Sequence, residues 1–149
     1  EYIAIESMEK EYAKSIFVNA INGGIMCYGD GSMDRPIAFV QVNIAELKKA
    51  ATSKGLTFND DEAMCNDAEC EKIVLTDLNK EGVAGGISNL EKLIAIKLIS
   101  GHGDPNKPEL NSPWTPDNLF LKASNKLNRK PIQMGLESLL DPLIQKAIR

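Results

Sequence analysis

Hydrophobic residues recur at helical spacing near the start of the chain. Successive members lie three or four residues apart and so fall on one helix face: Ile5, Met8, Tyr12, Ile16 and Ala20. Glycine adopts the left-handed backbone conformation that ends many helices. We therefore predict a helix of about 20 residues that ends at Asn22-Gly23-Gly24.

The end of the chain carries a second periodic set of apolar residues. Its spacing predicts an amphipathic helix whose buried face comprises Leu136, Leu139, Leu140, Leu143, Ile144 and Ala147. Pro142 lies within this pattern. Because a proline removes one helical hydrogen bond, we expect a kink or a restart of the helix there.

The segment 36–43 fits two structures. Its β-branched and aromatic residues favour a strand, which pairs with the apolar run 25–28 in a hairpin. The alternative is a helix capped by Asp34, with an apolar stripe of its own. We choose the strand, since the two runs are separated by turn-forming residues.

Further elements are predicted in the middle of the chain. Asn43 caps a helix over 44–54, and residues 72–76 are apolar and β-branched enough to form a strand. Ser88 and Glu91 have the spacing of a capping box, which predicts a helix that ends at Gly101.

A long irregular stretch follows, from Gly101 to Trp114, and contains three prolines and two glycines. Such stretches are unusual in compact domains and are often functional. Thr115-Pro116-Asp117 then begins a helix that we expect to reach about Leu127.

These elements define a fold class. The 149 residues have the length of one domain, and we see no linker or internal repeat that would divide residues 1–149. We predict a helix-rich α+β single domain with a small antiparallel sheet, and an all-α fold is the alternative.

The charge pattern narrows the possible partners. The formal net charge is −4 and the isoelectric point is about 5.1, so nucleic-acid binding is not expected. Acidic residues dominate 56–91 and basic residues dominate 92–149. No apolar run is long enough to span a membrane, and no basic secretory leader is seen, which favours the cytoplasm.

The three cysteines are expected to be reduced and mostly buried. A disulfide-stabilised secreted domain usually has more cysteines, in an even number. The alternative is a bridge between Cys65 and Cys70, which would leave Cys27 free.

The single histidine limits the catalytic chemistry. His102 excludes zinc sites that need two or three histidines, and any Ser–His or Cys–His mechanism must use it. One hypothesis is a small hydrolase with Cys27 as nucleophile, His102 as base and Asp104 as the residue that orients His102. A core cysteine and a surface histidine are the simpler interpretation.

Two acidic segments are candidate calcium sites, because calcium prefers carboxylate and carbonyl oxygens. The first contains Asp60, Asp61, Glu62 and Asp67, which equally suit a solvated helix start. The second has the spacing that opens a calcium-binding loop, at Asp77, Asn79 and Glu81, but position twelve is Ser88 rather than glutamate. Calcium is thus the one possible cofactor, and otherwise we expect none.

A basic cluster and the only tryptophan are candidates for partner binding. The cluster can contact phosphate or an acidic protein, and consists of Lys122, Lys126, Arg129 and Lys130. Trp114, flanked by prolines, is a candidate interface anchor. We therefore predict a non-enzymatic domain that binds a protein partner or self-associates through its polarised charge. The alternatives are the Cys27–His102 hydrolase and a calcium-stabilised surface protein.

Overall fold

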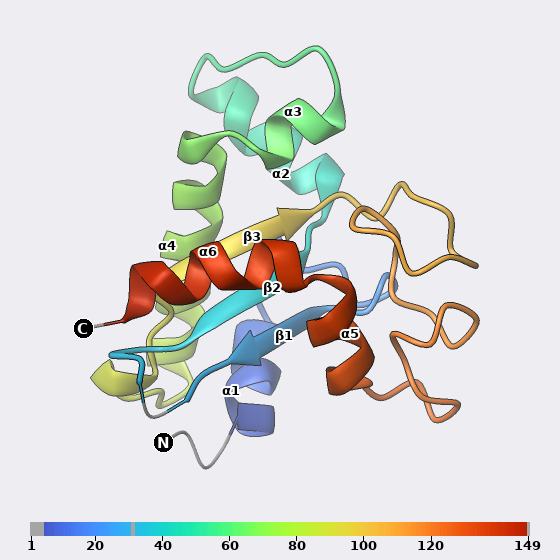
Figure 1. Cartoon of the computed structure of the whole chain (residues 1–149). Coiled ribbons are helices and arrows are strands. Elements are labelled where there is room, and N and C mark those ends of the chain that lie inside the picture. The colour runs from blue at the N-terminus through green and yellow to red at the C-terminus, as the bar shows by residue number, and fades with distance from the viewer. Residues whose placement is uncertain (1–4, 31, 149) are drawn as a thin grey trace.

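The fold consists of a small sheet covered by helices on both faces (Figure 1). A computed structural model describes residues 5–30 and 32–148. The strands are β1 (Ile25–Tyr28), β2 (Ile37–Gln41) and β3 (Ala95–Ile99). The helices are α1 (Ile5–Tyr12), α2 (Ile44–Ser53), α3 (Asp61–Cys65), α4 (Ala68–Ala84), α5 (Arg129–Gly135) and α6 (Glu137–Ala147), with a short 3-10 helix at Asn89–Glu91. None of the described helices is long and apolar enough to cross a membrane.

The sheet has the order β1-β2-β3 and is mixed. β1 and β2 form the predicted antiparallel hairpin, in which Ile25 pairs with Val40. β3 lies parallel to β2, with Ile37 beside Ala95, because the chain returns through α2, α3 and α4 before entering β3. The predicted helix-rich α+β class is confirmed, whereas the prediction of a purely antiparallel sheet is wrong.

Alternating residues of β2 supply two separate hydrophobic clusters, because successive side chains of a strand point to opposite faces. Ala38 and Val40 face the cluster that contains residues of α1, α2 and α4. Ile37 and Phe39 face the cluster beneath α5 and α6, together with Trp114 and residues of the 115–128 segment. All five residues of β2 are buried, so this strand is the centre of the molecule.

Two predicted elements in the first two thirds of the chain are wrong, and the predicted N-terminal helix is shorter than expected. Residues 72–76 lie inside helix α4, which begins where the Asp67 side chain accepts a hydrogen bond from the Cys70 backbone N–H. Ser88 and Glu91 do form a capping box, but it opens only the 3-10 turn. The apolar run that follows becomes β3, because pairing with β2 places its alternate residues in the two hydrophobic clusters. α1 ends at Tyr12, earlier than predicted, and Ile16 is exposed.

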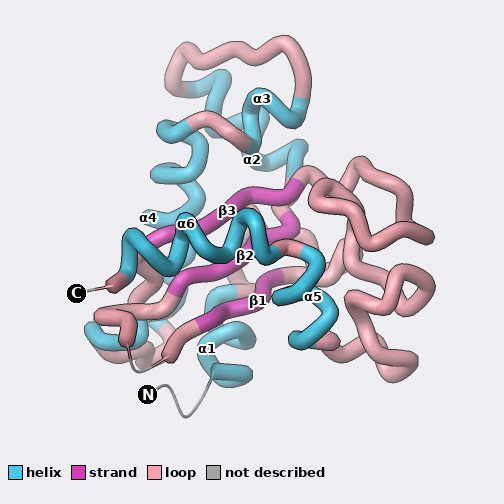
Figure 2. Tube along the Cα trace, in the orientation of Figure 1, coloured by secondary structure: helices cyan, strands magenta, loops and turns pink. Residues whose placement is uncertain are grey.

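The predicted helix over 115–127 is also wrong, and this segment continues the long loop drawn beside the sheet in Figure 2. The Asn118 side chain accepts hydrogen bonds from the backbone N–H groups of Thr115 and Phe120, which holds a turn instead of a helix. Leu119 and Asn125 have φ angles of 69° and 66°, outside the right-handed helical region.

The predictions of α2 and of a C-terminal amphipathic helix are confirmed, but the helix does not restart at Pro142 as expected. Asn43 caps α2 through its side chain, which accepts a hydrogen bond from the Glu46 N–H at 3.3 Å. α6 continues through Pro142, and the chain breaks instead at Leu136, between α5 and α6.

Close contact between α1 and α4 gives a test of this packing. A methyl group at Gly82 would lie 2.6 Å from the Tyr12 ring, and Tyr12 is fully buried. We expect Gly82→Ala to destabilise the protein by about 1–3 kcal/mol in urea unfolding, despite the better helix propensity of alanine. The control is Val83→Ala on the exposed side of the same helix, which should change stability much less. Equal stability of Gly82→Ala and the wild type would contradict this packing.

Candidate functional site

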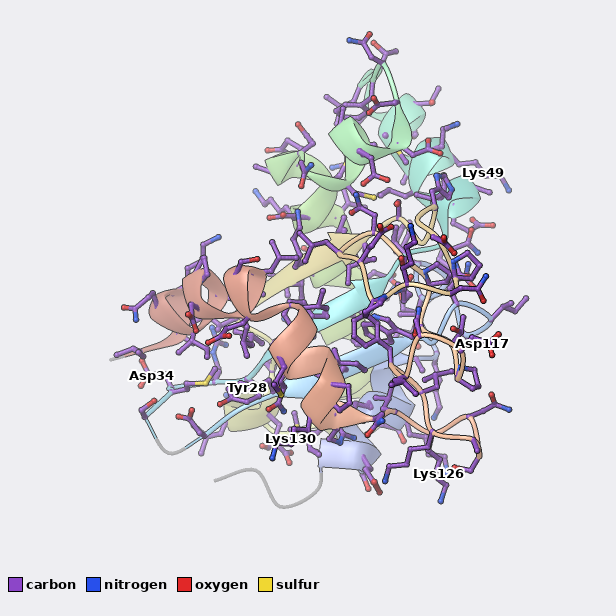
Figure 3. All side chains as sticks on the ribbon, turned by 45° about the vertical axis from the view of Figure 1, so that its right-hand side comes forward. Tyr28, Asp34, Lys49, Asp117, Lys126 and Lys130 are labelled. Carbon is purple, nitrogen blue, oxygen red and sulfur yellow. The ribbon has the colours of Figure 1, made fainter. Side chains whose placement is uncertain are left out.

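The basic residues identified in the sequence do meet in the structure. Lys122, Lys126, Arg129 and Lys130 line one surface hollow of about 640 Å³, which we call the basic hollow. Helix α1 contributes Glu6 and Glu9 to its wall, and the remaining lining residues are Asn125, Leu127 and Asn128. Figure 3 shows Lys126 and Lys130 at the same lower edge of the molecule, where α1 lies. Lysines 122, 126 and 130 are exposed.

A tight turn positions the lysines of the basic hollow. The Lys122 N–H donates to the Lys126 carbonyl at 2.8 Å, and Leu121 forms a β-bridge with Leu127. Asn125 adopts a positive φ at the tip, which asparagine tolerates better than most residues. The turn is fastened to the start of α5 by Asn128, whose backbone N–H donates to the Phe120 carbonyl at 3.0 Å.

Arg129 is the one basic residue of the hollow that forms an ion pair in the described part of the chain. Its two terminal nitrogens donate to the two carboxylate oxygens of Glu9, at 2.7 and 2.6 Å. Glu9 is only 8% exposed. The hydrogen bonds from Arg129 to Glu9 raise the pKa of Arg129, so this guanidinium remains charged.

The residues of the hypothetical hydrolase, Cys27, His102 and Asp104, interact with other groups and not with one another. Cys27 is buried in β1, and burial raises the pKa of its thiol well above the ordinary value. His102 lies beyond β3, where its Nδ1 is 3.4 Å from a carboxylate oxygen of Asp61. Asp104 accepts a hydrogen bond from the Asn106 N–H instead of orienting His102. This arrangement does not resemble a nucleophile activated by a neighbouring base.

The first acidic segment is used for helix capping and local polar contacts. Asp60 and Asp67 cap α3 and α4 through their side chains. Glu62 accepts a hydrogen bond from the Ser100 hydroxyl, and Asp61 also lies 3.6 Å from the Lys48 ammonium. Within 5–30 and 32–148, no group of three or more acidic, histidine or cysteine side chains is arranged to hold a metal ion.

The second acidic segment lies within helix α4, so the predicted calcium loop is a helix. Asp77 accepts a hydrogen bond from the Ser15 hydroxyl at 2.6 Å. The Asn79 side chain makes two hydrogen bonds with the backbone of Leu93, at 2.9 and 3.0 Å. Glu81 belongs to the last turn of this helix. Asp77 and Asn79 therefore connect α4 to neighbouring segments.

Trp114 is not a surface anchor. It is 1% exposed, and a methyl group added to Gly23 would lie 2.7 Å from its Cβ. Its backbone N–H donates to the Asn22 carbonyl at 2.7 Å, and nearby Gln41 donates from its side chain to the Ser112 carbonyl at 3.0 Å. Trp114 thus fastens the long loop to the end of the sheet.

Comparison with known proteins identifies relatives along nearly the whole chain. This chain is 30% identical over 146 residues to long-chain-fatty-acid–CoA ligase 1 of Saccharomyces cerevisiae. The match covers 95% of this chain and 19% of the yeast protein. It is also 30% identical over 129 residues to the peroxisomal long chain acyl-CoA synthetase 6 of Arabidopsis thaliana, covering 87% of this chain and 16% of that protein. The chain spans about a fifth of the length of these relatives. No protein-family profile matches it.

Solved structures show the same fold. The adenylation domain of a carboxylate reductase from Mycobacterium chelonae superimposes with a TM-score of 0.70 at 17% identity, over 96% of this chain and 18% of that one. The adenylation domain of a carboxylic acid reductase from Segniliparus rugosus was solved with AMP and a co-purified carboxylic acid. It superimposes with a TM-score of 0.69 at 18% identity, over 98% of this chain and 18% of that one. The chain has the fold of part of an adenylation domain.

These findings correct the functional predictions. The prediction of a non-enzymatic domain that binds a protein partner or self-associates is wrong. The similar proteins are enzymes, and their names describe the joining of fatty acids to coenzyme A. The alternatives, a Cys27–His102 hydrolase and a calcium-stabilised surface protein, do not match these relatives either. The expectation of no cofactor is not supported either. The relatives have coenzyme A in their names, and one similar solved structure contains AMP.

The basic residues of the hollow stand out in the sequence, whereas Glu9 does not. This glutamate lies in a helix between buried Met8 and Tyr12, and it follows Ile5 by four residues. That spacing brings it close to the apolar face of α1, which is the only signal of a buried charge. Nothing in the local sequence indicates that its partner lies 120 residues away.

The reactivity of the three thiols tests whether any cysteine is an activated nucleophile. All three cysteines are free and buried, and burial raises the pKa of Cys65 to about 12 and that of Cys70 to about 11. Because the thiolate is the reactive form, we expect no fast reaction with Ellman's reagent at a pH of about 8.5, where an ordinary cysteine is half ionised.

After unfolding in guanidinium chloride without reductant, all three thiols should react. One fast-reacting thiol in the native protein would instead identify an activated cysteine. A single thiol after unfolding would indicate a Cys65–Cys70 disulfide.

Proposed function

We propose that this chain is a segment of a long-chain acyl-CoA ligase and takes part in activating a fatty acid for transfer to coenzyme A. The observation that carries the proposal is the 30% identity to a yeast ligase of this kind over 95% of the chain. The shared fold with adenylation domains supports the same chemistry.

The reaction sets the requirements for the site. A carboxylate is a poor electrophile, so one carboxylate oxygen first attacks the α-phosphorus of ATP and pyrophosphate leaves. The resulting acyl adenylate is a mixed anhydride. The sulfur of coenzyme A then attacks its carbonyl carbon, and AMP leaves with the bonding electrons. ATP, the acyl adenylate and coenzyme A all carry phosphate, so the enzyme needs fixed positive charges beside them.

The basic hollow is suited to this role. Lys122, Lys126 and Lys130 present exposed ammonium groups around one depression, and the turn at 122–126 fixes two of them. An ammonium group binds a phosphate oxygen through charge-assisted hydrogen bonds. We propose that these lysines contact the phosphates of ATP or coenzyme A, with Lys126 as the central residue.

The test is a full-length yeast ligase in which this chain replaces the matching segment. We expect the hybrid to form the coenzyme A thioester of hexadecanoic acid. Lys126→Ala should lower kcat/KM for ATP by about tenfold or more, because it removes a positive charge that stabilises the negatively charged phosphates in the transition state. Lys107→Ala, on an exposed turn outside the basic hollow, is the matched control and should change little.

A second measurement uses this chain alone, so that misfolding of the hybrid does not decide the outcome. ATP or coenzyme A is titrated into the isotope-labelled chain, and NMR shifts should change most at residues 122–130. Failure of both ligands to shift this segment, together with an inactive but folded hybrid, would refute the proposed function.

A further inference from the structure

Arg129 differs from the three lysines of the basic hollow because its charge is already paired. Both terminal nitrogens are engaged by the buried carboxylate of Glu9. We propose that Glu9 is a positioning residue: by holding Arg129 it fixes the segment that presents Lys126 and Lys130 to the phosphates. This inference rests on the proposed function, and it assigns Arg129 to the framework of the site.

The Glu9 carboxylate joins three elements of the fold. It comes from α1, and its Oε2 accepts hydrogen bonds from the Cys27 backbone N–H of β1 and from Arg129, both at 2.7 Å. Arg129 is the first residue of α5. The edge of the sheet and the start of α5 are therefore tied to one buried charge.

The start of α5 carries two basic side chains and no acidic one. Its cap residue Asn128 makes no side-chain capping bond. Arg129 and Lys130 place positive charge where the helix dipole is already positive, which is unfavourable. Glu9 offsets the Arg129 charge at this helix start through the two hydrogen bonds that Arg129 donates to it.

The helix start in turn controls where the lysines lie. Lys126 precedes Arg129 by three residues, and Lys130 follows it directly. Between them, Asn128 is bonded through its backbone and its side chain to Phe120 and Leu119, on the other arm of the turn. A shift of Arg129 therefore moves both lysines.

Removing the Glu9 charge should change ATP affinity in opposite directions, depending on whether Glu9 acts only as a nearby charge or positions the segment. Glu9 is an anion in the wall of an anion site, so its simple removal should tighten ATP binding. If Glu9 instead positions the segment, Glu9→Gln should weaken ATP binding, because glutamine cannot offer two charged oxygens to the guanidinium.

The experiment compares Glu9→Gln with Glu6→Gln in this chain, using ATP as the probe and NMR titration for the affinity. Glu6 lines the same hollow but is exposed, so it serves as the matched control for lost negative charge. We expect Glu9→Gln to weaken ATP binding by about fivefold or more and Glu6→Gln to tighten it slightly. Arg129→Lys, which retains the charge but not the forked geometry, should behave like Glu9→Gln.

A readout without ligand separates this inference from the proposed function. Glu9→Gln should change the backbone shifts and reduce the amide order parameters of residues 126–130 while the protein remains folded. Unchanged order there, tighter ATP binding, or lower stability with unchanged affinity would each overturn the positioning role. Absence of ATP binding by the wild-type chain would instead count against the proposed function, and the order parameters would still test Glu9.

Discussion

The structure depends on burying a single strand from both sides. Every residue of β2 is inaccessible, and its alternating side chains serve two clusters that do not share members of this strand. A strand in this position needs apolar residues on both faces, and each face needs its own cover. α1, α2 and α4 provide one cover, while α5, α6 and the long loop provide the other. The small sheet thus organises residues from the whole described length of the chain.

A partly buried ion pair adds a constraint that apolar packing does not provide. Hydrophobic contact is non-directional, so it holds α1 and α5 near the sheet without fixing their orientation. The forked contact of Arg129 with Glu9 has a defined geometry, and the Cys27 N–H completes it. Such a pair contributes little net stability, because desolvation opposes the attraction. Its value lies in orienting the residues beside it.

The sequence predicts elements well where local signals act alone. Asn43 caps α2 as its spacing indicates, and the hairpin of β1 with β2 follows from two apolar runs around a turn. Prediction fails where a distant partner decides the structure. The apolar run at 93–99 fits a helix by its local pattern but becomes a strand beside β2, whereas 72–76 fits a strand but continues a helix capped by Asp67. The basic residues of the hollow can be picked out because charge is visible in a sequence. Glu9 was missed because its role exists only through Arg129.

The parallel pairing of β2 with β3 has a consequence for how the chain folds. β1 and β2 are neighbours in sequence, whereas α2, α3 and α4 all lie between β2 and β3. Ile37 meets Ala95 only after that whole segment has been closed into a loop, and the entropy of closure is lost before the pairing is gained. Until then one edge of β2 has unpaired backbone N–H and C=O groups. An unpaired strand edge can add a strand from another copy, so we expect the chain to be most prone to self-association in this interval.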